Sequence, residues 1–163
     1  MRVGSTTFDD SVARIGSETT VRGLLGGTCR ELVELLDATA CAVSRVIGDL
    51  LVGLDEYTLA TRPLEHGHEF LIPDYPLTRE VVESGEPRRV SRLDPDAERT
   101  ETALLEKLGY DTLLMVCLPS AGECWGLIEV YGDERGFDAE QIEIARRVAR
   151  VAGERLNQLD SRQ

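Results

Sequence analysis

Lysine is almost missing from this sequence: Lys107 is the only one among 18 basic residues, against 30 acidic residues. The formal net charge is therefore −12 at pH 7. A uniformly acidic surface repels the phosphate groups of nucleic acids and of anionic lipids. The charge balance excludes a basic nucleic-acid-binding face, and we expect no nucleic-acid partner and no membrane partner.

Long apolar runs are also missing. The longest, Leu113 to Leu118, is far shorter than the ~20 residues that a membrane-spanning helix needs. The first residues contain no apolar stretch of the signal-peptide kind. With 163 residues, 42% of them hydrophobic, the chain has the size and composition of one globular domain. We expect a soluble, cytoplasmic protein.

Cysteine and histidine are too few and too scattered for a metal site. The four cysteines contain no Cys-x-x-Cys pair, and none lies near His66 or His68 in the sequence. We expect buried, reduced cysteines and no metal. Cys117 and Cys124 flank a predicted hairpin and would be diagonal neighbours about 7 Å apart. A redox-sensitive disulfide between them is the less favoured alternative to inert strand cysteines.

Apolar residues at three- and four-residue steps predict a first helix from about Thr20 to Asp37. Gly23, Gly26 and Gly27 interrupt this pattern. Either the helix begins only at Thr28, or the glycines let a neighbouring helix approach closely, which we favour. Further patterns predict strands at 40–47, 50–58, 88–93, 112–119 and 124–131, helices at 77–84 and 96–108, and a long loop at 60–76.

The last helix has the clearest start signal, because Asp138 and Gln141 have the spacing of a capping box. Two apolar rows follow within this helix. We expect one row to pack inside the domain and the other on a partner helix. This interpretation assigns Leu156 and Leu159 to the interface of a homodimer.

The order of these elements is typical of an antiparallel α+β domain, because hairpins join the strands and helices lie at both ends of the chain. Both terminal helices should cover one face of the sheet, and the irregular middle should close over the other face.

Three segments resemble the GAF family of small-molecule sensory domains. They are Leu77 to Pro87, Leu108 to Pro119, and Trp125 to Tyr131 with the following Gly136 to Ile142. The resemblance runs over residues 20–157, which leaves 1–19 as an N-terminal tail or leader helix and 158–163 as a C-terminal tail. It implies a sheet of six antiparallel strands, with terminal helices on one face and a roof of loops and short helices over a ligand pocket on the other.

The resemblance implies a regulatory sensory domain that binds a small ligand or a protein partner and signals through its terminal helices. The alternative is a dimerisation or scaffold module whose pocket is filled by its own side chains. The third hypothesis is an enzyme of the free methionine sulfoxide reductase kind, which the absence of cysteine between Val43 and Val116 disfavours. Phosphate-loop and nucleophile motifs are absent, so we expect no enzymatic activity.

No cofactor is predicted. Bilin-carrying GAF domains attach their pigment to a central cysteine, which this sequence lacks. The minor alternatives are haem on His66 or His68, and a cyclic nucleotide whose phosphate would be held by Arg79, Arg88 and Arg92. The neighbouring Glu80, Glu83 and Glu86 instead favour ion pairs at the surface.

We place any ligand between the roof and the sheet, where a cavity is expected. The candidate pocket residues are Phe70, Tyr75, Arg92, Tyr110, Thr112 and Met115, with His66 and His68 at the rim.

Overall fold

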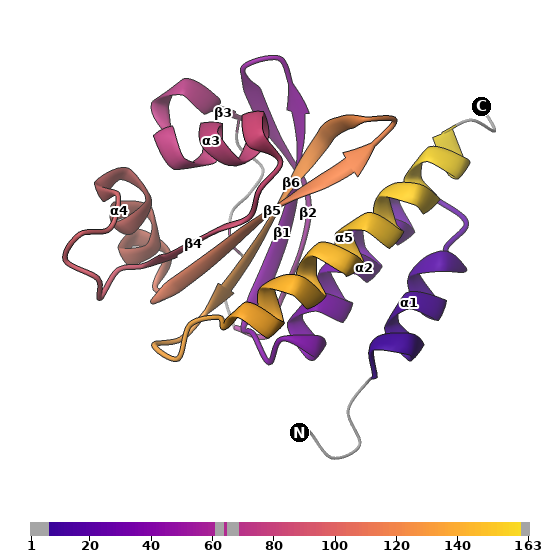
Figure 1. The fold of residues 1–163 in the computed structure, drawn as a ribbon, viewed down its shortest axis with the longest axis horizontal. Coiled ribbons are helices and arrows are strands. Elements are labelled where there is room, and N and C mark those ends of the chain that lie inside the picture. Colours follow the sequence, from indigo (N-terminus) through magenta and orange to yellow (C-terminus); the bar gives the residue numbers. More distant parts are fainter. Residues whose placement is uncertain (1–6, 61–63, 65–68, 161–163) are drawn as a thin grey trace.

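A six-stranded antiparallel sheet separates two layers of helices in the computed structural model, which describes residues 7–60, 64 and 69–160 (Figure 1). In chain order the elements are α1 (Phe8–Gly16), α2 (Val21–Leu35), β1 (Ala40–Ile47), β2 (Leu50–Thr58), β3 (Glu69–Leu71), the 3-10 helix η1 (Ile72–Asp74), α3 (Pro76–Ser84), β4 (Arg88–Ser91), α4 (Arg99–Leu108), β5 (Thr112–Ser120), β6 (Glu123–Gly132) and α5 (Ala139–Asp160). The expected α+β architecture is confirmed.

The strands follow the order β3-β2-β1-β6-β5-β4, so β1 and β6 form the centre of the sheet. The loop expected at 60–76 is wrong in part, because it contains β3 and η1. A strand of three residues is too short to show an alternating pattern in the sequence.

Helices α1, α2 and α5 cover one face of the sheet, and α3 and α4 cover the other (Figure 1). The predicted capping box is present: the amide of Gln141 donates to Asp138 Oδ1 at 2.8 Å, and the amide of Asp138 donates to Gln141 Oε1 at 2.9 Å. None of the described helices combines the length and the apolar character needed to cross a membrane.

Leu156 and Leu159 do not form an exposed dimer seam. They are only 1% and 6% exposed and belong to the core beneath the terminal helices. The second apolar row of α5, with Ile144 and Val151, packs into the same core beside Phe8 of α1. The partner helix is therefore α1 of the same chain. The homodimer stays a prediction, without this seam to support it.

Helix α1 is fastened to α2 by a buried carboxylate. Glu31 is 2% exposed, and it accepts hydrogen bonds from Arg14 Nε at 2.9 Å and from the Ser11 hydroxyl at 2.7 Å. Burial alone would raise the pKa of Glu31, but these hydrogen bonds hold it below its ordinary value. Helix α1 is thus tied to the domain by both packing and charge.

The three glycines lie inside α2, which begins at Val21 with Thr20 as its N-cap. A helix that starts at Thr28 is therefore wrong. The favoured close approach of a neighbouring helix is wrong as well. The nearest atom to a Cβ on Gly23 or Gly27 belongs to the Glu18 side chain, and the nearest atom to a Cβ on Gly26 belongs to Asp55 of β2. A close backbone approach occurs instead at Gly153 of α5, where a Cβ would overlap the carbonyl oxygen of Pro119.

Cys117 and Cys124 form a disulfide across the β5–β6 hairpin, so the preference for inert cysteines at these positions is wrong. The Cα atoms are 5.6 Å apart, because the strand register shifts between Leu118 and Pro119. Cys29 and Cys41 are free and buried, as expected.

Candidate functional site

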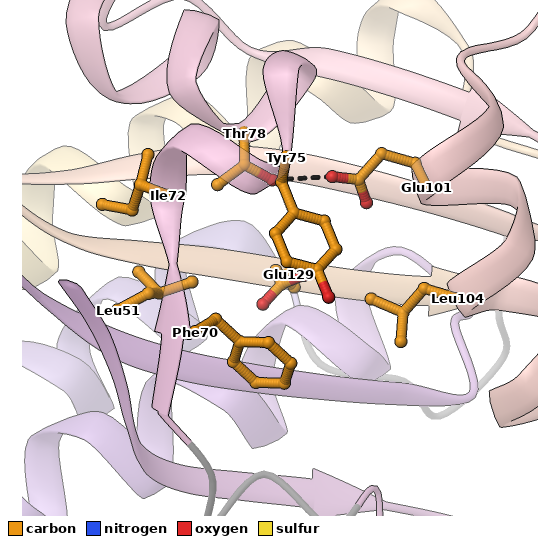
Figure 2. Close-up of a pocket in the computed structure, with 8 residues that line it drawn as sticks. All are labelled: Leu51, Phe70, Ile72, Tyr75, Thr78, Glu101, Leu104 and Glu129. Atoms are coloured by element: carbon orange, nitrogen blue, oxygen red, sulfur yellow. Dashed lines mark hydrogen bonds between the residues drawn. The ribbon is translucent and has the colours of Figure 1, made fainter. Parts of the chain in front are cut away.

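A small pocket lies between the roof and the sheet, where the ligand was expected. It encloses about 20 Å³, which is room for one water-sized group. Eight side chains line it (Figure 2): Leu51, Phe70, Ile72, Tyr75, Thr78, Glu101, Leu104 and Glu129. They come from β2, β3, η1, α3, α4, β6 and the residue between η1 and α3.

The rim of the pocket is apolar and aromatic. Phe70, Tyr75 and Leu104 are half-buried, and the rings of Phe70 and Tyr75 meet edge to face with centroids 5.8 Å apart. Burial, followed by the charges of Glu101, Asp74 and Glu129, raises the pKa of Tyr75. The Tyr75 side chain therefore lies in the field of the carboxyl groups below it.

Glu101 brings a carboxyl group into the pocket from α4. It is 1% exposed, and the Thr78 hydroxyl donates to its Oε1 at 2.7 Å (Figure 2). Its Oε2 is buried without a hydrogen-bond partner among the described residues. Burial, reinforced by the charge of Glu129, raises the pKa of Glu101 to about 7.

Glu129 brings a second carboxyl group from the middle of β6. It is 5% exposed and accepts a hydrogen bond from the Tyr131 hydroxyl at 3.2 Å. Residues 127, 129 and 131 share the strand face toward the roof, which puts the carboxyl group among apolar side chains. Burial raises the pKa of Glu129 to about 7, although Tyr131 favours the ionised form.

Of the predicted pocket residues, Phe70 and Tyr75 line the pocket. Met115 is fully buried behind it, with its sulfur 3.4 Å from the Thr78 hydroxyl. Tyr110 packs against Tyr131, with ring centroids 5.2 Å apart, and does not reach the pocket.

Thr112 and Arg92 lie elsewhere, so their placement in the pocket is wrong. The hydroxyl of Thr112 donates to the carbonyl oxygen of Asp133, beside the turn that leads to α5. Arg92 forms an ion pair with Asp111 at 2.7 Å. His66 and His68 lie outside the described residues, so the structure does not place them. Among the residues that the structure does describe, no group of three or more His, Cys, Asp or Glu side chains could hold a metal ion.

The other two arginines proposed for a phosphate are also paired with carboxylates. Arg79 meets Glu83 at 2.9 Å, and Arg88 meets Glu80 at 2.7 Å. The preference for surface ion pairs over a phosphate cradle is confirmed for these two.

The sequence analysis did not identify the two carboxyl groups. Glu129 did leave a signal, since it is a charged residue inside the apolar strand Leu127 to Tyr131. Such a residue is expected to have a partner or a function. Glu101 left no such signal. It is one of several acidic residues in a helix whose sequence predicts a solvent-exposed surface.

Comparisons with known proteins agree with this architecture. The structure resembles the phycoerythrobilin-bound GAF domain from a cyanobacterial phytochrome, with a TM-score of 0.84 and 17% identity over 98% of both chains. It also resembles the chromophore-binding domain of a bacteriophytochrome from R. palustris, with a TM-score of 0.83 and 12% identity over 96% of this chain and 62% of that one. The corresponding domain from Stigmatella aurantiaca gives a TM-score of 0.77 and 15% identity, over 96% of this chain and 59% of that one.

The chain thus spans only about 60% of the two bacteriophytochrome fragments. A search of curated proteins gives no match. The model of the GAF domain matches residues 21–156, from the first residue of α2 to the buried Leu156 of α5. Because that match takes in the whole sheet, the roof and the pocket, the chain belongs to the GAF domain family.

Proposed function

We propose that this GAF domain is a sensory module whose pocket binds a small organic cation with an apolar or aromatic body. One observation carries the proposal: Glu101 Oε2 is buried in the pocket with no hydrogen-bond partner among the described residues. Burying an acceptor without a hydrogen-bond partner destabilises the folded protein. A donor on a bound ligand would remove most of this destabilisation.

The charge of the pocket selects the donor. Two carboxyl groups lie at its floor, and none of the described residues that line it is basic. An ammonium or amidinium group supplies both hydrogen-bond donors and the opposite charge. The aromatic rim fits such a ligand as well, because aromatic side chains can pack against its apolar or aromatic body.

The size of the pocket limits how the ligand would sit. A cavity of about 20 Å³ accepts an ammonium group but not a ring. The charged group would therefore lie on the floor, and the apolar body would lie at the rim against Phe70, Tyr75 and Leu104.

A bilin, such as the phycoerythrobilin of the cyanobacterial neighbour, does not fit these residues. The pocket lining has no cysteine for a covalent link, and the carboxyl groups of Glu101 and Glu129 would repel propionate side chains. A cyclic nucleotide meets the same difficulty, since its phosphate needs donors and the pocket offers two acids.

Binding would be transmitted to the terminal helices through one strand. Glu129 faces the pocket from β6, whereas its neighbours Ile128 and Val130 face the core under α2 and α5. A change in the charge or position of Glu129 therefore reaches residues that contact the helices. We infer that α2 and α5 carry the signal.

Calorimetry with a matched series of aromatic probes tests the proposal. At pH 8 we expect binding of benzylamine, weaker or no binding of benzyl alcohol, and no binding of benzoate. At pH 6.5, where the carboxyl groups still bind protons, protons released on binding should appear as a heat that depends on the buffer, because a cation lowers the pKa of the carboxyl groups.

Glu101→Gln should abolish the binding of benzylamine. Glu106→Gln, an exposed change on the same helix, should leave it intact. Equal binding of the alcohol and the amine, or an unaffected Glu101→Gln variant, would reject the cation site. If no probe binds, and if adding the probes leaves the amide hydrogen exchange of α5 unchanged, the dimerisation or scaffold module becomes the better account.

A further inference from the structure

We propose that the Cys117–Cys124 disulfide is a thiol–disulfide exchange site that reacts with a dithiol. We further propose that its redox state changes the dynamics of helix α5. This site is separate from the pocket described above and does not depend on its ligand.

A bulge in the hairpin makes the disulfide possible. Leu118 pairs with Gly126, but the next pair is Pro119 with Cys124, so β6 has one extra residue at this point. In a regular ladder Cys124 would lie opposite Ser120 and point to the other face of the sheet. The bulge places it opposite Pro119, on the same face as Cys117.

The disulfide borders a hollow of about 400 Å³ at the surface. The wall on one side is the end of α3 with the following Gly85, and on the other side it is α5. Cys117 is 9% exposed, and Cys124 is half-buried. A small thiol can therefore reach the sulfur of Cys124, whereas Cys29 and Cys41 are buried in the core.

Charged side chains of both signs line this hollow. Arg146 and Arg150 line it from successive turns of α5, opposite Glu83 and Glu123. Arg146 is paired with Glu86 at 3.5 Å, whereas Arg150 has no carboxylate within ion-pair distance among the described residues. A guanidinium group near a sulfur lowers the pKa of the thiol and makes it a better leaving group.

The hairpin is in direct contact with α5 beside the disulfide. Pro119 lies between the two cysteines in the sequence, and its carbonyl oxygen abuts Gly153, where no side chain would fit. Gly153 is one turn beyond Arg150. The disulfide holds the conformation of the hairpin, and the hairpin contacts α5 at this point. A change in the hairpin on reduction would therefore reach α5.

The exchange balances as two successive displacements. A thiolate of the dithiol attacks the sulfur of Cys124, the protein S–S bond breaks, and the electron pair leaves on the sulfur of Cys117. The second thiol of the reductant, once deprotonated, attacks its own sulfur in the mixed disulfide and releases Cys124 as a thiolate. The reductant leaves as a disulfide after giving up two electrons, and both cysteines take up protons.

The test is alkylation of the folded protein after equilibration with dithiothreitol, followed by mass spectrometry. We expect Cys117 and Cys124 to be alkylated together, and Cys29 and Cys41 only after denaturation. Alkylation of all four cysteines only in denaturant would overturn the proposal, since the disulfide would then be a closed structural link. Alkylation of Cys117 and Cys124 without reductant would also overturn it.

Arg150→Gln tests the electrostatic part. Exchange should become slower in this variant, because a leaving thiol with a higher pKa leaves more slowly. Arg147→Gln is the matched control on the same helix, because Arg147 lies over the ring of Phe8, away from the hollow. Equal effects of the two variants would reject a role for Arg150.

Amide exchange around Gly153 tests the coupling. It should differ between the oxidised and reduced proteins, and the double variant Cys117→Ser/Cys124→Ser should match the reduced one. Identical exchange in the oxidised and reduced forms would show that α5 does not sense the disulfide.

Discussion

Glu101 and Glu129 face one cavity from two different layers of the fold, Glu101 from helix α4 of the roof and Glu129 from the central strand β6. Burial raises the pKa of each to about 7. The pocket is therefore mostly uncharged in mild acid and anionic in mild base. This change of charge near neutral pH affects both stability and binding.

Stability should fall as the pH rises from about 4.5 to about 7. In that range the unfolded chain, whose glutamates have ordinary pKa values near 4.5, has lost protons that the folded protein still binds. The loss should reach a few kcal/mol for the pair, since one pKa unit is about 1.4 kcal/mol. Urea unfolding at pH 5.5 and pH 8 measures it.

The double variant Glu101→Gln/Glu129→Gln is the control for this pH dependence. It lacks both titrating groups, so its stability should change much less between pH 5.5 and pH 8. An unchanged slope in the double variant would mean that other groups cause the effect.

Leu156→Ala should destabilise the protein by about 2–5 kcal/mol, because it opens a cavity in a packed core. Leu93→Ala, at a position that is 56% exposed, should have little effect. Chemical denaturation compares the two. If the Leu156→Ala variant stays stable and changes only its oligomeric state, Leu156 would belong to a dimer interface after all.

Two glycine substitutions should have opposite effects. Gly153→Ala should destabilise by about 1–3 kcal/mol, because its Cβ meets the Pro119 backbone, which cannot rotate away. Gly27→Ala should stabilise by about 0.5–1 kcal/mol, because alanine is the better helix former and meets Glu18 only at an ordinary contact distance. The melting temperatures of the two variants show directly whether each substitution raises or lowers the stability.

Arg14→Gln should loosen α1, because it leaves the buried carboxylate of Glu31 without its main partner. Amide exchange and proteolysis in α1 should become faster, whereas Arg30→Gln, with a nitrogen 3.8 Å from Glu31, should have a small effect. Because the pKa of Glu31 is lowered, this fastening holds above about pH 4.5 and weakens as the pH falls through the folded value. Equal amide exchange of α1 in the Arg14→Gln and Arg30→Gln variants would contradict the assignment of Arg14 as the main partner of Glu31.

Most of the fold could be predicted from local signals in the sequence. The capping box at Asp138 and Gln141 fixed the start of α5, and Gly85 and Gly109 end α3 and α4 in the left-handed conformation that glycine tolerates. Element boundaries of this kind depend on a few neighbouring residues, which a sequence displays directly.

The tertiary relationships could not be predicted in the same way. The apolar row containing Ile144 shows that something covers it, but not whether the cover is α1 or a second chain. The partner of Glu101 lies on a different element, and the bulge beside Pro119 shifts the register between β5 and β6 without any local signal. These features depend on three-dimensional register rather than on periodicity.

Helix α4 also carries the one lysine of the chain. Lys107 is exposed, whereas Glu101 and Leu104 of the same helix reach the pocket. Lys107 is therefore the one side chain that an amine-reactive fluorophore can label, once the α-amino group has been blocked at a lower pH at which lysine is still protonated. The label would sit on the roof itself without any engineered residue, so a ligand that shifts α4 would be seen as a change in its emission.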